Sequence, residues 1–344
     1  MSYKIILDLI NKSKMPNCVL IYGIEEFLID KIVKLTKKMY IDENYEDMNY
    51  EEFENLENNF DSFKQFVSTF PFMTNKKLCI IKNSSFLTST GSLNKKEEEI
   101  TLDFIDKGYD SYIIIFLIKG GKPDLRKKAV KKLKNGNCIF EINKLNEAEL
   151  SKYILEEFKR NKIDISLSDA DYIANNSGYL EYESNISLYE INNEVNKLLS
   201  YSMESKRIQR EDIDNLMVKS IESNIFKLVD NICEGNKDKG FEVLEEMLLN
   251  NTSEQYIIHM IVRQYRMIYQ YVLLKTKNYN FNEIMKKMKI KKFVASKLEK
   301  QSKKLTLNQI EKYMVKFIEI DRKIKVGEID KRIGIELITN GIIK

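Results

Sequence analysis

The sequence has little of what several classes of protein require. Its 344 residues include only 3 prolines and 12 glycines, which leaves few turn formers and favours long helices over many short strands. Cys18, Cys79, Cys138 and Cys233 form no CxxC pair, and the single histidine, His259, lies next to none of them. Because a metal site needs several converging ligands, we expect no metal, no cofactor and no disulfide framework, with the thiols reduced.

Strong net charge and long apolar runs are missing as well. The chain carries 56 Lys and Arg against 52 Asp and Glu, a net charge of +4, which is too small to indicate a nucleic-acid partner by itself. The longest apolar run, Ile113 to Ile118, is far shorter than the ~20 residues of a membrane span. The amphipathic stretch Met1 to Ile10 has no cleavable signal after it. We therefore expect a cytoplasmic protein with no membrane partner.

The first ~142 residues alternate between short apolar runs and helical stretches. Continuous apolar runs separated by helices are typical of a parallel sheet that is covered on both faces. The predicted strands are 18–22, 78–81, 112–118 and 138–142, and the predicted helices are 25–39, 60–70 (ended by Pro71), 95–107 and a basic helix over 124–134. The sequence thus predicts an α/β domain over residues 1–142.

After residue 143 the strand-like runs disappear. Asn146, followed three residues later by Glu149, is a capping arrangement that opens the first of a series of helices. The expected helices are 146–161, 167–176, 184–201 and 211–218, and the pattern stays helical to the end of the chain. We divide this part into a small helical domain over 143–216 and a larger one over 217–344.

An α/β domain followed by a small helical domain raises the question of ATP binding. A phosphate-binding P-loop needs glycines, a lysine and a serine or threonine. Directly after the first predicted strand the chain has Gly23, Glu25 and Glu26 but no Lys, Ser or Thr before Phe27. Carboxylates at a helix N-terminus repel the phosphates that this end of a helix otherwise attracts. The sequence predicts a degenerate nucleotide site, and it offers no catalytic residues elsewhere.

The segment 69–74 crowds apolar residues where the chain leaves a predicted helix. Phe70, Phe72 and Met73 surround Pro71. Two interpretations remain open on physical grounds alone. The three side chains either fold back into the core under the strand at 78–81, or they form an apolar plug that fits a pocket on another protein.

Two basic clusters and an aromatic stripe complete the candidate surfaces. Lysines and arginines at helical spacing suit contacts with a DNA backbone, although such runs are more often solvated faces. The first cluster consists of Lys122 with residues 126–134, and the second spans residues 286–304. The candidate DNA contacts lie in the first cluster and are Lys122, Arg126, Lys127 and Lys128. The stripe formed by Ile257, Ile261, Tyr265, Ile268 and Val272 predicts core or subunit packing.

Taken together, these residues resemble the delta subunit of the bacterial DNA polymerase III clamp loader over nearly the whole chain. The resemblance rests on the order and spacing of several segments. These are Leu20–Ile29, Thr69–Phe72 with Asn75–Leu78, Lys122–Lys128, Ile261–Arg266, Ile290–Val294, Asp321–Gly327 and Ile335–Leu337.

The resemblance implies an AAA+-like (RecA-type) domain that does not bind nucleotide, a helical lid-like domain and a helical collar for oligomerisation. It further implies a hetero-pentamer with delta-prime and the ATP-hydrolysing tau/gamma subunits, acting on primed DNA as part of a DNA polymerase holoenzyme. Phe70, Pro71, Phe72 and Met73 would insert into the ring-shaped sliding clamp (beta) and open it during DNA replication. Some relatives place Leu in this segment, so the position carries over better than the individual contacts.

Three other functions remain as alternatives at this point. An AAA+ ATPase with an atypical nucleotide site would keep the fold and bind nucleotide. A stand-alone DNA-binding protein would use the basic clusters. A paralogous subunit such as delta-prime is disfavoured because no zinc-type cysteine cluster is present.

Overall fold

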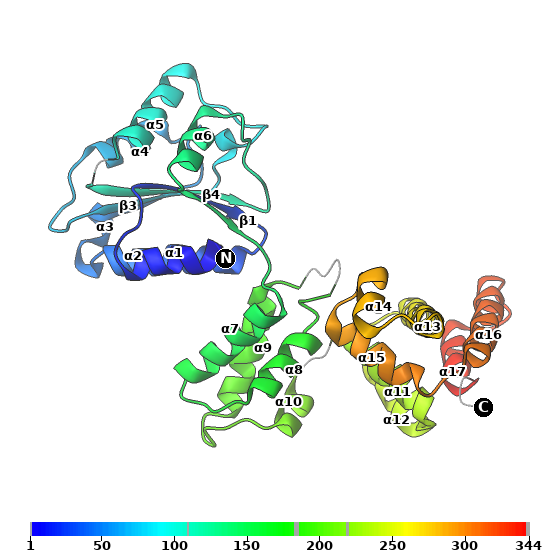
Figure 1. The fold of residues 1–344 in the computed structure, drawn as a ribbon. Coiled ribbons are helices and arrows are strands. Elements are labelled where there is room, and N and C mark those ends of the chain that lie inside the picture. Colours follow the sequence, from blue (N-terminus) through cyan, green and yellow to red (C-terminus); the bar gives the residue numbers. More distant parts are fainter. Residues whose placement is uncertain (1, 109, 182–185, 218–219, 342–344) are drawn as a thin grey trace. The chain divides into compact units, whose positions relative to one another are not determined.

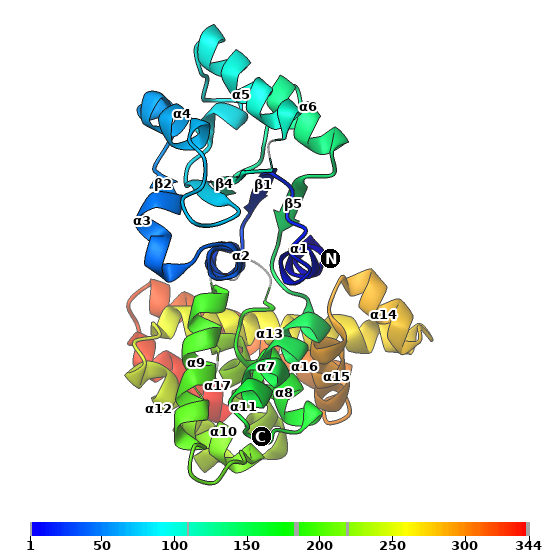
Figure 2. The same ribbon diagram turned by 90° about the vertical axis from the view of Figure 1, so that its left-hand side faces the viewer.

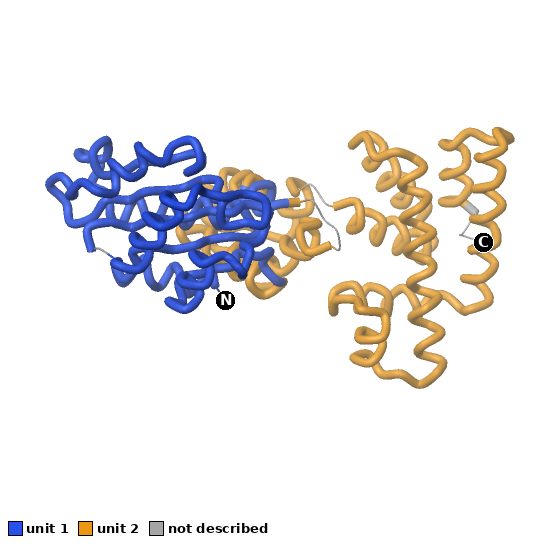
Figure 3. The backbone as a smooth tube through the Cα atoms, turned by 90° about the horizontal axis from the view of Figure 1, so that it is seen from above, with its two compact units in different colours: residues 1–146, 187–192 blue, residues 147–186, 193–344 orange. Residues whose placement is uncertain are grey.

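The computed structural model describes residues 2–108, 110–181, 186–217 and 220–341. The chain divides into two compact units, which Figure 3 distinguishes by colour. Unit 1 comprises residues 1–146 together with 187–192, and unit 2 comprises residues 147–186 together with 193–344. The division of the helical part at 216/217 into lid-like and collar domains stays a prediction.

Unit 1 is built on a five-stranded parallel sheet with the strand order β2-β3-β4-β1-β5. The central strand β4 is buried along its length from Tyr112 to Ile118, which explains its unbroken apolar run. The strands are β1 (Cys18–Gly23), β2 (Tyr50–Phe53), β3 (Lys77–Ile81), β4 (Tyr112–Lys119) and β5 (Ile139–Ile142). This architecture, with helices following, confirms the predicted fold class.

Helices cover both faces of the sheet, α1 and α2 on one side and α4, α5 and α6 on the other (Figures 1 and 2). Their bounds are α1 (Ser2–Asn11), α2 (Glu26–Tyr40), α3 (Glu46–Asn49), α4 (Phe60–Ser68), α5 (Lys95–Lys107) and α6 (Lys128–Asn135), with short 3-10 turns at Glu43–Tyr45 and Ser85–Leu87. On the α4 side, Phe63 of α4 makes edge-to-face contacts with Phe53 and Phe104. These aromatic contacts fix α4, and therefore the place where the chain leaves it.

One strand and two helix ends of unit 1 differ notably from the sequence prediction. The sequence does not predict strand β2. Glu51 and Glu52 in its middle are exposed, so the strand lacks the continuous apolar run by which the other strands are recognised. The basic helix begins at Lys128 instead of Asp124, because the Asp124 carboxylate accepts from the Arg126 backbone N–H at 2.9 Å in a turn after Pro123. Helix α4 ends at Ser68, two residues earlier than expected.

Among the described residues of unit 2, the regular elements are all helices apart from an isolated β-bridge between Asp164 and Arg207. Its helices are α7 (Glu147–Arg160), α8 (Leu167–Asn176), α9 (Leu188–Tyr201, whose first residues belong to unit 1), α10 (Arg210–Leu216), α11 (Ile221–Glu234), α12 (Lys237–Leu249), α13 (Glu254–Thr276), α14 (Phe281–Met288), α15 (Lys292–Ser302), α16 (Leu307–Lys325) and α17 (Lys331–Gly341). The predicted helix start at 184 and the predicted helix end at 218 fall outside the described residues. None of the described helices combines the length and hydrophobicity that crossing a membrane requires.

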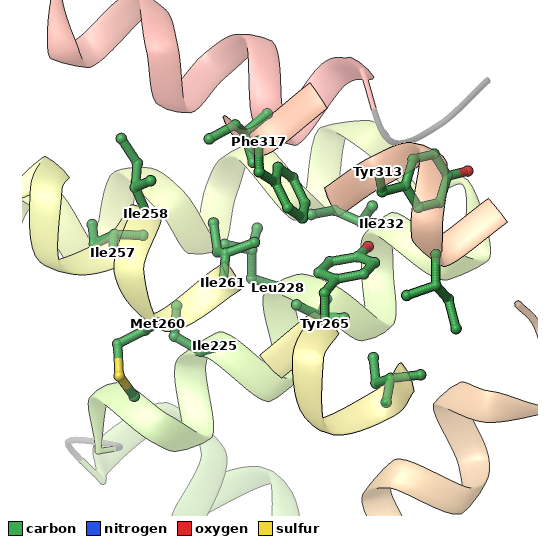
Figure 4. Packing of buried hydrophobic residues seen from close by; sticks show 14 of the residues in the cluster. Ile225, Leu228, Ile232, Ile257, Ile258, Met260, Ile261, Tyr265, Tyr313 and Phe317 are labelled. Carbon is green, nitrogen blue, oxygen red and sulfur yellow. The ribbon is translucent and has the colours of Figure 1, made fainter. Parts of the chain in front are cut away.

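The core of the C-terminal helices centres on α13 (Figure 4). Ile257, Ile261, Tyr265 and Ile268 are fully buried, so the predicted stripe lies in the core for these four residues. The Tyr265 ring packs edge-to-face against Phe317 of α16, with ring centroids 5.2 Å apart. The one histidine, His259, is exposed on the same helix.

Candidate functional site

The loop that follows α4, residues 69–74, presents apolar side chains to solvent. Phe70 is 88% exposed, Met73 is 74% exposed and Phe72 is 45% exposed. The interpretation that all three fold back into the core under β3 is therefore wrong. Exposed large apolar side chains that lie together on a surface mark a contact with another protein. We call residues 69–74 the apolar loop.

Of the three side chains, Phe72 is the least exposed. Its ring packs edge-to-face on Tyr45, with centroids 5.7 Å apart, while nearly half of its surface stays exposed. Met48 of α3 is also exposed, by 56%. Phe70 and Met73 are thus the freely projecting residues of the loop, and Phe72 forms its base.

The predicted nucleotide position lies at the carboxyl end of β1, and Gly23 is closed in by strand β5. The Gly23 backbone has a φ of +145°, and a Cβ atom there would lie 2.0 Å from the Ile142 carbonyl oxygen. Its own carbonyl accepts from the Gly120 N–H at 2.9 Å. The Glu25 N–H, which follows this glycine, is also engaged, because it donates to the Ile142 carbonyl at 3.3 Å.

Glu25 occupies the space in front of α2 from within the protein. It is 1% exposed, and its Oε1 accepts from the backbone N–H of Leu188 at 3.2 Å. Leu188 is the first residue of α9, so the carboxylate satisfies an otherwise unpaired helix N-terminal donor. The sequence placed Glu25 and Glu26 here correctly, but the partner, 163 residues away along the chain, carried no recognisable signal.

Tyr189, the second residue of α9, packs against α2 next to Glu25. Its ring lies edge-to-face against Phe27, with centroids 5.0 Å apart, and its hydroxyl donates to the Asp30 carboxylate. Burial, followed by the hydrogen bond to Asp30 and the nearby charges of Glu26 and Glu25, raises the pKa of Tyr189 to about 12. Glu25 and Glu26 thus place two carboxylates at the start of α2, whereas the Asp30 carboxylate is paired with the Lys119 Nζ at 2.6 Å.

The basic segment after β4 is only partly available for a ligand. The Arg126 guanidinium is paired with the Asp124 carboxylate, with Nη2 to Oδ2 at 2.8 Å, and this pairing lowers the pKa of Asp124 to about 2. The Lys127 Nζ donates to the Gly91 carbonyl at 2.7 Å. Lys122 and Lys128 are exposed, and no carboxylate of the described residues forms an ion pair with either of them. In the described ranges, no three His, Cys, Asp or Glu side chains converge to hold a metal.

Unit 2 contains a cavity of about 620 Å³ lined by Phe226, Met267 and Phe293 together with Arg263 and Glu181. Burial raises the pKa of the Glu181 carboxyl to about 7 from 4.5, an effect that the Ser220 hydrogen bond and the charges of Arg263 and Lys291 only partly offset. The cavity is thus a place where a carboxyl group changes its charge near neutral pH.

We expect Glu181→Gln to stabilise unit 2 at pH 8 and to have little effect at pH 4.5. A raised carboxyl pKa means that the folded state holds its proton more tightly, so stability falls as the pH rises from about 4.5 to about 7. The glutamine avoids this loss, which we put at about 2–3 kcal/mol at pH 8. Urea denaturation of both proteins at the two pH values measures it, and equal stabilities at pH 8 would contradict the assignment.

Comparisons with known proteins agree with this architecture. A family model described as DNA polymerase III, delta subunit, matches residues 19–143, and a second, for the C-terminal domain of the delta subunit, matches residues 222–341. DNA polymerase III subunit delta of Bacillus subtilis (strain 168) is 24% identical over 337 residues, 97% of this chain and 95% of that protein. The solved structure of the Bacillus subtilis DNA clamp loader delta protein covers 100% of this chain and 99% of its own, with a TM-score of 0.56 and 23% identity, and supports the fold. Since the two family models together match well over half of the residues, the chain belongs to the delta subunit family of DNA polymerase III.

Proposed function

We propose that this chain binds the ring-shaped sliding clamp through the apolar loop and opens it for loading onto primed DNA, without hydrolysing ATP. The observation that carries the proposal is the exposure of Phe70 and Met73, at 88% and 74%, which are the two most exposed large apolar side chains among the described residues of unit 1. Exposed apolar residues that are close together in one loop supply the kind of anchor side chain that a pocket on a partner protein can bury.

The proposal assigns ATP hydrolysis to neighbouring subunits. Glu25 is buried at the N-terminus of α2, where its carboxylate accepts from Leu188, and Glu26 adds a second carboxylate. A site of this kind has neither the donors nor the charge for a nucleotide. In the assembly the partners are delta-prime and the tau/gamma subunits of a cytoplasmic hetero-pentamer, with residues 217–344 as the collar and 143–216 as the lid-like domain.

Clamp opening is a matter of differential binding. A ligand shifts a conformational equilibrium only by the difference between its affinities for the two states. The apolar loop must therefore make better contacts with the clamp whose interface is open. Burial of the exposed parts of Phe70, Phe72 and Met73 supplies roughly 3–6 kcal/mol before entropy losses, which is enough to matter at one interface of a ring.

A fluorescence reporter placed across one interface of the clamp tests the proposal. We expect the wild-type chain to lower energy transfer across that interface in a solution free of ATP. A chain that binds the clamp but leaves the transfer unchanged would remove opening from its function. Tight, salt-dependent binding of the lone chain to primed DNA with no clamp binding would favour the stand-alone DNA-binding alternative.

The contact of the assembled loader with DNA gives a separate expectation. Lys122 and Lys128 are exposed and without an ion pair among the described residues, whereas Arg126 and Lys127 are engaged. Lys122→Ala/Lys128→Ala should flatten the dependence of log affinity on log salt by about 2. Arg126→Ala/Lys127→Ala should change this slope by less than about 1. Equal slopes for the wild type and the first variant, measured by fluorescence anisotropy, would rule out Lys122 and Lys128 as contacts.

A further inference from the structure

The backbone of the apolar loop is held by a buried amide. Asn49, the last residue of α3, is fully buried. Its Nδ2 donates to the Phe72 carbonyl oxygen and its Oδ1 accepts from the Phe72 N–H, both at 2.8 Å. The same Nδ2 donates to the Tyr45 carbonyl at 3.1 Å. The side chain thus takes the place of a neighbouring strand and fixes both polar groups of one loop residue.

The other end of the loop is held by a buried lysine. Lys77, at the start of β3, is 4% exposed. Its Nζ donates to the Phe66 carbonyl at 2.9 Å and to Thr69 Oγ1 at 2.6 Å, and it lies 4.0 Å from the centre of the Phe66 ring. Among the described residues no carboxylate forms an ion pair with it.

The negative end of a helix explains why a charged lysine is buried at this place. The last carbonyls of α4 have no intrahelical partner and carry a partial negative charge. The Lys77 ammonium group satisfies one of them, and Thr69, the residue that ends the helix, donates to the same Phe66 oxygen at 3.0 Å. The direction in which the chain leaves α4 toward Phe70 is set by these bonds.

Directly after Phe72 the chain adopts a backbone conformation that needs support. Met73 has a φ of +54°, in the left-handed region that residues other than glycine seldom adopt. Such a conformation persists where the surroundings determine it. The bonds to Phe72 on one side and the start of β3 on the other provide this constraint.

We propose that Asn49 and Lys77 are positioning residues for clamp binding, which present the apolar loop in its binding conformation before the clamp arrives. The inference rests on the proposed function of the loop. A loop that is ordered before binding does not lose that freedom in the complex, so its affinity is higher than that of a free loop with the same side chains. Neither residue touches the clamp in this proposal.

Two variants with matched controls test it. Asn49→Ala removes both bonds to Phe72. Its control, Thr36→Ala, removes a buried side-chain to backbone bond within α2, which the Thr36 Oγ1 donates to the Ile32 carbonyl. Lys77→Met keeps the apolar stem but loses the ammonium group, and Lys132→Met removes a lysine that pairs with Asp106 instead. Binding to the purified sliding clamp, the melting temperature and amide hydrogen exchange are measured for each full-length chain.

We expect Asn49→Ala and Lys77→Met to weaken clamp binding by about tenfold each, while the controls stay within about twofold of the wild type. Exchange of the Phe72 amide should become faster in Asn49→Ala and stay slow in Thr36→Ala. In a Phe72→Ala background, Asn49→Ala should weaken binding by less than it does in the wild type, because both changes act on one contact. A residue important only for folding would produce additive losses.

The outcomes distinguish the positioning role of Asn49 and Lys77 from the proposed binding of the clamp by the apolar loop. Positioning is overturned if the Phe72 amide exchanges equally fast in wild type and Asn49→Ala, or if both variants bind the clamp as the wild type does. It is likewise overturned if Thr36→Ala and Lys132→Met weaken binding as much as the test variants. A wild-type chain that fails to bind the clamp contradicts the proposed function itself, whatever the exchange rates are.

Discussion

A Phe70→Ala/Phe72→Ala variant should bind the sliding clamp about 100- to 1000-fold more weakly than the wild-type chain while remaining folded. Phe70 is 88% exposed and Phe72 is 45% exposed. Most of the apolar surface that the two substitutions remove is therefore surface that the isolated chain leaves in solvent and that a bound partner covers. A fully buried phenylalanine contributes about 1.5–3 kcal/mol. With Phe72 counted at about half, the loss is about 3–4 kcal/mol, and each 1.4 kcal/mol is tenfold in affinity. Titration calorimetry against the purified clamp measures the effect.

Leu249→Ala is the matched control for this variant. Leu249 ends α12 in unit 2 and is 81% exposed, similar to Phe70. If general surface hydrophobicity caused binding, its loss would weaken binding comparably. Undiminished binding of the double variant would remove the apolar loop from the clamp contact.

Gly23→Ala should destabilise unit 1 by about 3–5 kcal/mol and lower its melting temperature by about 10 °C. The new Cβ would lie 2.0 Å from the carbonyl oxygen of Ile142 and 2.7 Å from its carbon. Both obstructing atoms belong to the backbone of β5, which pairs with β1 through Gly23 and Ile142. The clash is relieved only by separating the two strands. Thermal unfolding followed by circular dichroism measures the change.

Gly120→Ala distinguishes this clash from backbone strain alone. Gly120 also has a positive φ, +67°, but nothing lies within 4 Å of a Cβ placed there. Its substitution should therefore cost only the left-handed strain, about 1–2 kcal/mol. Equal destabilisation by the two substitutions would mean that the close approach of β5 to Gly23 is not what requires the glycine.

Much of the fold follows from local patterns in the sequence. The buried strands β1, β3 and β4 have continuous apolar runs, and the absence of a P-loop lysine is visible directly after β1. The exposed loop could be located but not oriented, because an apolar residue next to a proline packs inward or outward according to contacts formed by distant segments. The structure decides this with the 88% exposure of Phe70.

The residues that support the site carried no local signal. Asn49 acts on Phe72, 23 residues away, and Glu25 acts on Leu188, 163 residues away. Lys77 stands in the sequence only as part of a charged segment before a strand, yet it is buried against the end of α4. Side-chain to backbone bonds of this kind depend on tertiary proximity, which periodicity and composition do not encode.

The most direct test of the account is the affinity of the isolated wild-type chain for its sliding clamp, measured by calorimetry without nucleotide and again with Mg²⁺ and ATP. The account predicts binding with the same dissociation constant in both solutions, because the apolar loop is already exposed and the proposal assigns no nucleotide to this chain. Binding that requires ATP, or no binding in either solution, would contradict it.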